Sequence, residues 1–110
     1  MTNEFGEKLD RNGYAASIMQ DDLTRCWRCG RTDRKLDRHE VYGASNRDKS
    51  KALGLWVMLC HDACHEGQTG VHQNVNEGRY LKQVTQRRAM RHYGWSVDEF
   101  RRRLGKNWLE

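Results

Sequence analysis

Residues 26–29 read Cys26-Trp27-Arg28-Cys29, and residues 60–65 read Cys60-His61-Asp62-Ala63-Cys64-His65. Two close cysteine pairs separated by one longer segment have the spacing of a structural zinc site, because thiolates are good ligands for tetrahedral zinc. Gly30 follows the first pair and can adopt the positive φ that a tight turn needs. We therefore expect one structural Zn²⁺ ion on four cysteines: Cys26, Cys29, Cys60 and Cys64.

Two other interpretations of the cysteines stay open at this point. A thioredoxin-like redox pair is one, although the sequence lacks the βαβ pattern that such a pair accompanies. Unligated cysteines in the core are the other. A disulfide framework is disfavoured, because the polar, acidic first residues do not read as a secretion signal and thiols stay reduced in the cytoplasm, where we expect this protein.

The composition is that of one small domain. The chain has 110 residues, no proline and 36% hydrophobic residues, which predicts a small core that a metal ion would help to stabilise. No apolar run approaches the ~20 residues of a membrane span. The four Trp and four Tyr follow no heptad or triplet period, which excludes coiled coil, collagen and full disorder.

Charge is distributed unevenly along the chain. Residues 1–22 carry a net charge of −3, whereas the remaining residues carry +8. A basic body of this kind is typical of proteins that bind a polyanion, with nucleic acid the leading candidate. The alternative is a charged surface that only keeps the protein soluble.

The hydrophobic pattern predicts short strands and then helices. Alternation over 36–43 and the apolar run 55–59 predict two strands, joined by a basic loop over 44–51. Apolar spacing over 76–93 predicts a helix that ends at Gly94. Ser96 and Glu99 form a capping box that opens a second helix through about residue 104, after which Trp108 and Leu109 should return to the core.

Three histidines are associated with these segments. His39 lies in the first predicted strand, His65 follows the last cysteine, and His72 ends the sequence Gly70-Val71-His72. A divalent ion held by imidazoles beside a basic surface is suited to phosphodiester hydrolysis, because it offsets charge on the phosphate and the leaving oxygen. His61 is a substitute ligand in this scheme, and His92 is expected to be structural.

The cysteine pairs, the segment Asp37-Arg38-His39-Glu40-Val41 and the sequence Cys64-His65 resemble HNH nucleases of the ββα-metal type. More narrowly, the chain resembles small phage and prophage proteins of that type. The resemblance implies an α+β fold with a ββα-metal (HNH) core, structural zinc knuckles and additional C-terminal helices. It divides the chain into an acidic N-terminal extension packed on the core (1–22) and an HNH/zinc domain with the C-terminal helices (23–110).

The same resemblance implies the function and the site. We expect a metal-dependent DNA endonuclease, a phosphodiester hydrolase, that acts in phage DNA recombination, replication or packaging in the cytoplasm of a bacterial host cell. Mg²⁺ or another divalent ion would be the catalytic ion, and DNA the partner, together with phage recombination or packaging proteins. The ligands of that ion would be His39, His65 and His72.

Two positions depart from the family pattern. Glu40 stands where a histidine base is usual, so either His39 or Glu40 would activate water. Leu55 stands where the middle Asn is expected, and Asn46 is a candidate to supply that amide. These departures keep a second hypothesis open, a non-catalytic zinc-stabilised module for nucleic-acid binding or recombination. In either case the predicted phosphate contacts are Arg47, Lys49, Lys51, Arg87 and Arg88.

Overall fold

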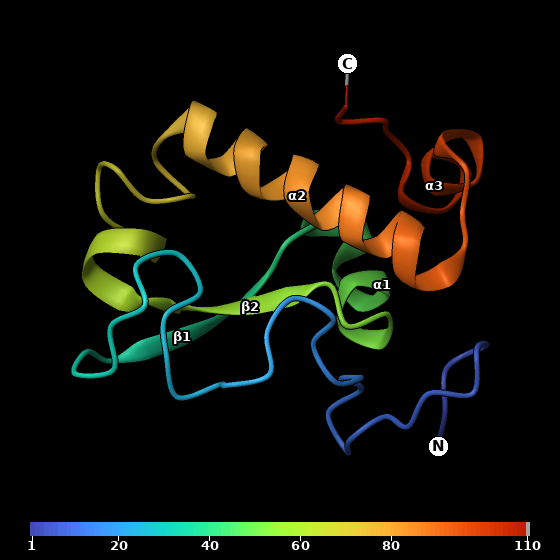
Figure 1. The fold of residues 1–110 in the computed structure, drawn as a ribbon, viewed down its shortest axis with the longest axis horizontal. Coiled ribbons are helices and arrows are strands. Elements are labelled where there is room, and N and C mark those ends of the chain that lie inside the picture. Colours follow the sequence, from blue (N-terminus) through green and yellow to red (C-terminus); the bar gives the residue numbers. More distant parts are fainter. Residues whose placement is uncertain (110) are drawn as a thin grey trace.

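The computed structural model describes residues 1–109 and confirms the α+β class (Figure 1). Strands β1 (Leu36–Glu40) and β2 (Trp56–Cys60) form an antiparallel sheet in which Leu36 faces Cys60 and Glu40 faces Trp56. Two short helical segments, η1 (Ala44–Asn46) and α1 (Arg47–Ala52), connect the strands. A wide turn, η2 (His61–His65), and helices α2 (Val75–Tyr93) and α3 (Val97–Leu104) follow. Glu110, the last residue of the predicted 23–110 domain, lies outside the described residues.

The predicted loop over 44–51 is wrong, because the whole stretch is helical. Ser50 explains the difference. Its hydroxyl is fully buried, donates to the Tyr42 carbonyl oxygen at 2.8 Å and accepts from the Tyr42 N–H at 3.0 Å. Ser50 therefore fixes α1 to the residues that follow β1. Because the buried residue of α1 is a serine, the hydrophobic pattern does not reveal this helix. The first strand also ends at Glu40, earlier than predicted, since Val41 and Tyr42 turn into the core.

Helix α2 begins one residue before the predicted stretch 76–93, and helix α3 begins directly after Ser96, as predicted. Asn74 caps α2 by accepting from the Glu77 N–H at 3.1 Å, and Gly94 ends it with φ +72°. Ser96 caps α3 in the same way through the Glu99 N–H. The helix start at Ser96 and the glycine stop at Gly94 are therefore confirmed, whereas the Glu99 carboxylate, the other half of the predicted capping box, accepts from Arg102 and Arg103 instead.

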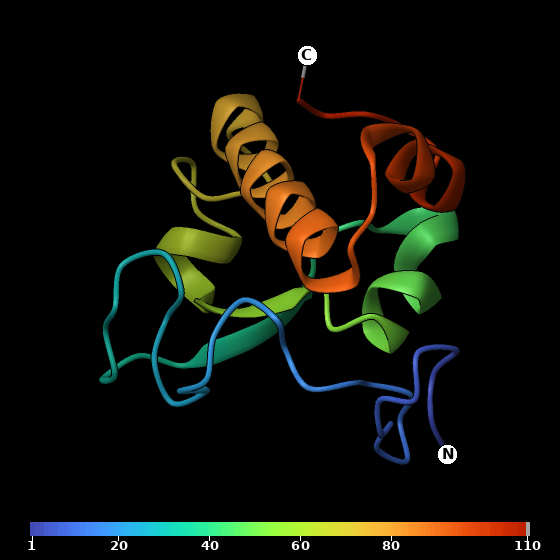
Figure 2. The same cartoon turned by 45° about the vertical axis from the view of Figure 1, so that its right-hand side comes forward.

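The core lies between the hairpin and the two long helices, and α2 crosses over the strands (Figures 1 and 2). Leu55, directly before β2, and Val57 and Leu59 of β2 are fully buried. Phe100 of α3 joins them, also fully buried. Trp108 packs against this core as expected.

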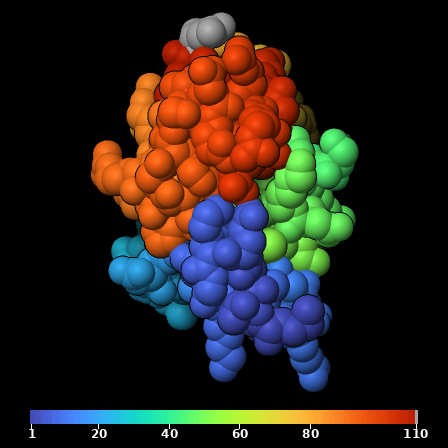
Figure 3. Space-filling view, turned by 90° about the vertical axis from the view of Figure 1, so that its right-hand side faces the viewer, coloured from blue at the N-terminus to red at the C-terminus, as the bar shows by residue number. Residues whose placement is uncertain are grey.

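The N-terminal segment begins beside the ends of α2 and α3 (Figure 3) and then runs along β2 toward residue 22. The Ser17 hydroxyl donates to the Trp56 carbonyl oxygen, and Gln20 Oε1 accepts from the Met58 N–H at 2.6 Å. These bonds occupy polar groups on the edge of β2 that β1 does not pair. Glu7 reaches α2, where it accepts a 2.6 Å hydrogen bond from the Tyr93 hydroxyl.

None of the helices in the described part of the chain combines the length and the apolar character that a membrane crossing needs.

Candidate metal centres

The four cysteines come together at one end of the hairpin. Their sulfur atoms lie within 4.8 Å of one another, and the Sγ atoms of Cys29 and Cys60 are 3.9 Å apart. A tetrahedral ion with metal–sulfur bonds of about 2.3 Å requires sulfurs roughly 3.8 Å apart. The cluster therefore fits a metal ion such as zinc.

The first cysteine pair is shaped by a tight turn. Gly30 adopts φ +76°, its N–H donates to the Cys26 carbonyl oxygen at 2.9 Å, and the Cys29 N–H points at the Cys26 sulfur at 3.5 Å. Of the second pair, Cys60 ends β2 and Cys64 lies in η2, a wide, π-helical turn closed by the Glu66 N–H on the His61 carbonyl oxygen. Wide turns of this kind are frequent at functional sites.

The electrostatics of the cluster favour a cation. Burial and the neighbouring Cys60 sulfur raise the pKa of Cys64 to about 12. Burial also opposes ionisation of Cys26, but backbone N–H groups, first that of Cys29, lower its pKa to about 7. Arg28 adds a guanidinium N–H 3.5 Å from the Cys64 sulfur. Thiolates this close repel one another, and a divalent cation is the group that offsets their charge.

Beside the cysteines, three imidazoles converge. The ring nitrogens of His39, His65 and His72 lie within 4.8 Å of one another, and the Nε2 atoms of His65 and His72 are 2.9 Å apart. Neighbouring ligands of an octahedral ion at about 2.1 Å are separated by roughly 3.0 Å. The structure thus brings together the three histidines that the sequence singled out, in a geometry that could hold a second metal ion.

The backbone explains how His65 and His72 reach the same point. His65 ends η2, directly after Cys64, and the Val71 N–H donates to the Cys64 carbonyl oxygen at 2.9 Å. Gly70 leaves no room for a side chain, since a Cβ there would lie 2.8 Å from the Cys64 carbonyl carbon. This close approach brings the loop back and places the His72 ring 4.5 Å from the His65 ring, centroid to centroid.

Asp37 contacts the outer ring nitrogen of His65, on the side away from His72. Its Oδ2 lies 2.8 Å from Nδ1 of His65 and 2.5 Å from Nδ1 of His61. Burial opposes the charge of Asp37, but the hydrogen bonds from His65 and His61 lower its pKa below the ordinary value. A carboxylate that accepts the Nδ1–H of His65 leaves its Nε2 unprotonated, with the lone pair toward the other histidines.

Asp37 was not among the predicted site residues. The signal that reveals it is its spacing from His39, because residues two apart on a strand share one face. On that face the burial of His39, together with the nearby His65 and His72, lowers its pKa to about 3. His39 is therefore neutral at pH 7, which is the form that binds a metal ion.

Glu40 points away from His39, as successive strand residues do. Its carboxylate accepts a 2.7 Å hydrogen bond from Arg47, while the Arg38 guanidinium lies 4.1 Å above the Tyr14 ring centre. A surface cavity of about 310 Å³ nevertheless brings these groups together with the imidazoles. It is lined by Arg38, His39, Glu40, Gly43, Arg47, His65 and His72.

Neither candidate position for the middle Asn of the motif supplies an amide to the imidazoles. Leu55 is fully buried in the core, and the amide of Asn46 donates to the Leu104 carbonyl oxygen at 2.9 Å, on α3.

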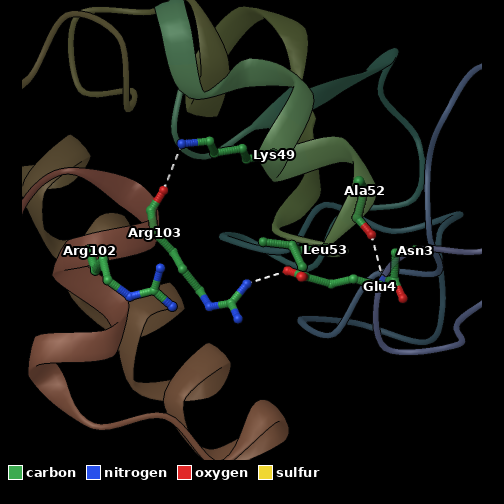
Figure 4. Close-up of a pocket in the computed structure, with 7 residues that line it drawn as sticks. All are labelled: Asn3, Glu4, Lys49, Ala52, Leu53, Arg102 and Arg103. Carbon is green, nitrogen blue, oxygen red and sulfur yellow. Dashed lines mark hydrogen bonds and ion pairs between the residues drawn. The ribbon is translucent and has the colours of Figure 1, made fainter.

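The predicted phosphate-contacting residues are spread over several surfaces. Arg47 lines the histidine cavity, and Lys51 lies 4.8 Å from the Tyr14 ring centre. Lys49 instead donates to the Arg103 carbonyl oxygen beside a separate cavity of about 400 Å³ between the N-terminal segment, α1 and α3 (Figure 4). Arg87 and Arg88 are exposed on α2.

Comparisons of this chain with protein-family models, with curated proteins and with solved structures find no match. The HNH resemblance therefore stays a prediction carried by the motifs alone.

Proposed function

We propose that this protein is a metal-dependent DNA endonuclease of HNH type that hydrolyses phosphodiester bonds and serves phage DNA recombination, replication or packaging. The observation that carries the proposal is the convergence of His39, His65 and His72 at an open cavity, with Asp37 bonded to the outer nitrogen of His65.

The residues of the cavity have separable roles in this proposal. The three imidazoles hold a divalent ion, Mg²⁺ or a transition metal, which when bound supplies positive charge for the scissile phosphate and the leaving oxygen. Arg38 and Arg47 line the same cavity and attract a phosphate group to it. With His39 as a ligand, Glu40 accepts the proton of the attacking water; if the two residues exchange roles, His39 accepts the proton and Glu40 takes its place at the ion. The four-cysteine cluster stabilises the turn that carries His65.

A plasmid relaxation assay tests this function. Zinc-loaded protein with added Mg²⁺ or Mn²⁺ should nick or linearise supercoiled DNA, and His39→Ala should reduce the rate by at least about 100-fold. His92→Ala is the matched control, because His92 is an exposed histidine of α2 that contacts Glu7 and not the cluster. It should cleave at the wild-type rate.

Zinc content and thermal melting, measured on each variant, separate catalysis from folding. The proposal fails if the wild type leaves supercoiled, linear, single-stranded and branched DNA intact with every divalent ion tried. It also fails if His39→Ala cleaves as fast as the wild type.

A second function, a zinc-stabilised nucleic-acid-binding module without catalysis, is favoured by two observations. Glu40, which stands in the base position, is held in an ion pair with Arg47, and Leu55 occupies the middle motif position in the core. This function predicts salt-sensitive DNA binding that His39→Ala leaves unchanged, with no cleavage by the wild type.

A further inference from the structure

The histidine cavity continues into a groove. Three cavities, of about 310, 170 and 470 Å³, share lining residues: Gly43 lines all three, and Lys82 lines the second and the third. His39 and His72 line the first two, whereas Trp108 lines the third. The groove therefore leads from the three-histidine cluster, past β1 and α2, to the indole of Trp108.

Side-chain amides of α2, one of them fully buried, hold Trp108 at the end of this groove. Gln86 of α2 is fully buried. Its Oε1 accepts from the backbone N–H of Trp108 at 2.7 Å, and its Nε2 donates to Oδ1 of Asn107 at 2.8 Å. Gln83 donates to the Trp108 carbonyl oxygen at 2.9 Å. A buried amide is costly unless its hydrogen bonds are made, so these bonds fix the tail in one position.

The groove is positively charged at this end. The Nζ atoms of Lys82 and Lys106 lie 4.8 and 4.2 Å from the Trp108 ring centre. Two ammonium groups beside one ring repel each other, and burial of Lys82 together with the charge of Lys106 lowers the pKa of Lys82. Among the described residues, those that line this cavity include both lysines and no carboxylate. An anion placed here would relieve that repulsion.

The backbone is strained where the Trp108 end of the groove begins. Ala44 adopts φ +52°, a left-handed conformation that is costly for a residue with a Cβ, and it follows Gly43 at the middle of the groove. Such strain persists only where the surrounding structure imposes it, and it is concentrated at binding sites.

We propose that this groove binds a single-stranded segment of DNA, with one unpaired base stacked on Trp108 and the adjoining phosphates on Lys82 and Lys106, and that it guides the strand toward the three-histidine cluster. The inference rests on the proposed function, because it names the form of DNA that this site acts on. Only an unpaired base can present its face to a ring fixed inside a groove, and stacking on an aromatic ring with phosphate contacts beside it is how single strands bind without sequence preference. The lysine side chains are flexible, so each ammonium group can leave the ring for a phosphate oxygen.

The test measures binding without cleavage. Fluorescence anisotropy is recorded for zinc-loaded His39→Ala protein with a labelled short oligothymidylate and, in parallel, with a blunt hairpin duplex, without added divalent ion. We expect the single strand to bind more tightly than the duplex. Adding Trp108→Leu, which keeps apolar bulk but removes the flat ring, should weaken single-strand binding roughly tenfold and leave duplex binding unchanged.

Two control variants accompany this change. Trp108→Phe keeps a ring and should bind the single strand within about twofold of the parent. Tyr80→Leu removes an exposed aromatic residue of α2 that lines none of the three cavities of the groove, and it should have no effect.

The lysines give a readout that does not depend on the fold of a Trp108 variant. Lys82→Gln and Lys106→Gln should each reduce the slope of log K against log salt by about 0.7 for the single strand. Unchanged slopes, equal loss of single-strand and duplex binding in Trp108→Leu, or tighter binding of the duplex by the parent would each overturn the proposal. Because no step requires cleavage, a failure of the endonuclease assay and a failure of this binding assay are independent results.

Discussion

Replacement of Asp37 by Asn tests how the three-histidine cluster is held. The carboxylate accepts from Nδ1 of His65 at 2.8 Å, and this bond sets which ring nitrogen faces the other histidines. Asparagine keeps the size of the side chain but replaces a charged acceptor with a neutral one. The expected consequence is weaker binding of the exchangeable divalent ion, with the cysteine-bound zinc unaffected.

The size of the effect follows from the bonds that change. A hydrogen bond to a charged group contributes about 1.5–3 kcal/mol and one between neutral groups about 0.5–1.5 kcal/mol, so Asp37→Asn should cost about 1.4 kcal/mol, or roughly tenfold in affinity. Asp37→Ala removes the acceptor altogether and should weaken binding roughly 100-fold, the upper range for residues that orient metal ligands.

The assay is a titration of zinc-loaded protein with Mn²⁺, with free Mn²⁺ followed by electron paramagnetic resonance. Asp62→Asn is the matched control, since Asp62 lies next to His61 but its side chain is 75% exposed and lies 4.0 Å from Arg34. It should bind Mn²⁺ as the wild type does. Wild-type affinity in both Asp37 variants would refute the proposed support of His65, and loss of zinc from them would show that Asp37 acts on the fold instead.

Three further perturbations have expected outcomes. Gly70→Ala should lower the free energy of unfolding by about 1–3 kcal/mol, because the new Cβ would clash with the Cys64 backbone. Gly43→Ala is the control, since a Cβ there meets open space and should leave the free energy of unfolding unchanged. Thermal melting of both variants checks this. Burial opposes ionisation of Glu7, but hydrogen bonds from the Tyr93 hydroxyl and His92 lower the pKa of its carboxyl group. The stability that ionised Glu7 contributes is therefore present above about pH 4.5 and is lost as the pH falls. In urea denaturation at several pH values, Glu7→Gln should lose less stability than the wild type toward acid pH, and an equal loss in both proteins would contradict this role of Glu7. Removal of zinc by a chelator should abolish the cooperative thermal unfolding transition, because the free energy of zinc binding, about 10–16 kcal/mol, exceeds the free energy of unfolding of a small domain. Unchanged melting of the metal-free protein would contradict a structural role for the cysteines.

Features with strong local chemistry were predictable from the sequence. The cysteine spacing predicted the cluster, and Ser96 and Gly94 marked helix ends that the structure confirms. Helix α1 was missed because its buried position is Ser50, whose reason for being inside is a pair of hydrogen bonds to Tyr42 that no periodicity encodes.

The histidines of the candidate site could be predicted from the sequence, but the residues that hold them in position could not. The three histidines belong to motifs, and the structure brings them together. Asp37 acts through a contact with His65 that only the folded turn creates. The end of the groove likewise depends on Gln86, a polar residue that the hydrophobic pattern places outside but that is buried to hold the tail. Buried polar side chains carry long-range contacts, and a one-dimensional pattern does not show them.

A crystal of the zinc-loaded protein soaked in Mn²⁺, with anomalous difference maps recorded at the zinc and manganese edges, tests the central claim most directly. We expect a zinc peak among the four sulfurs and a manganese peak among His39, His65 and His72, at about 2.0–2.2 Å from their ring nitrogens. A zinc peak at the cysteines with no manganese density among the three histidines would contradict it.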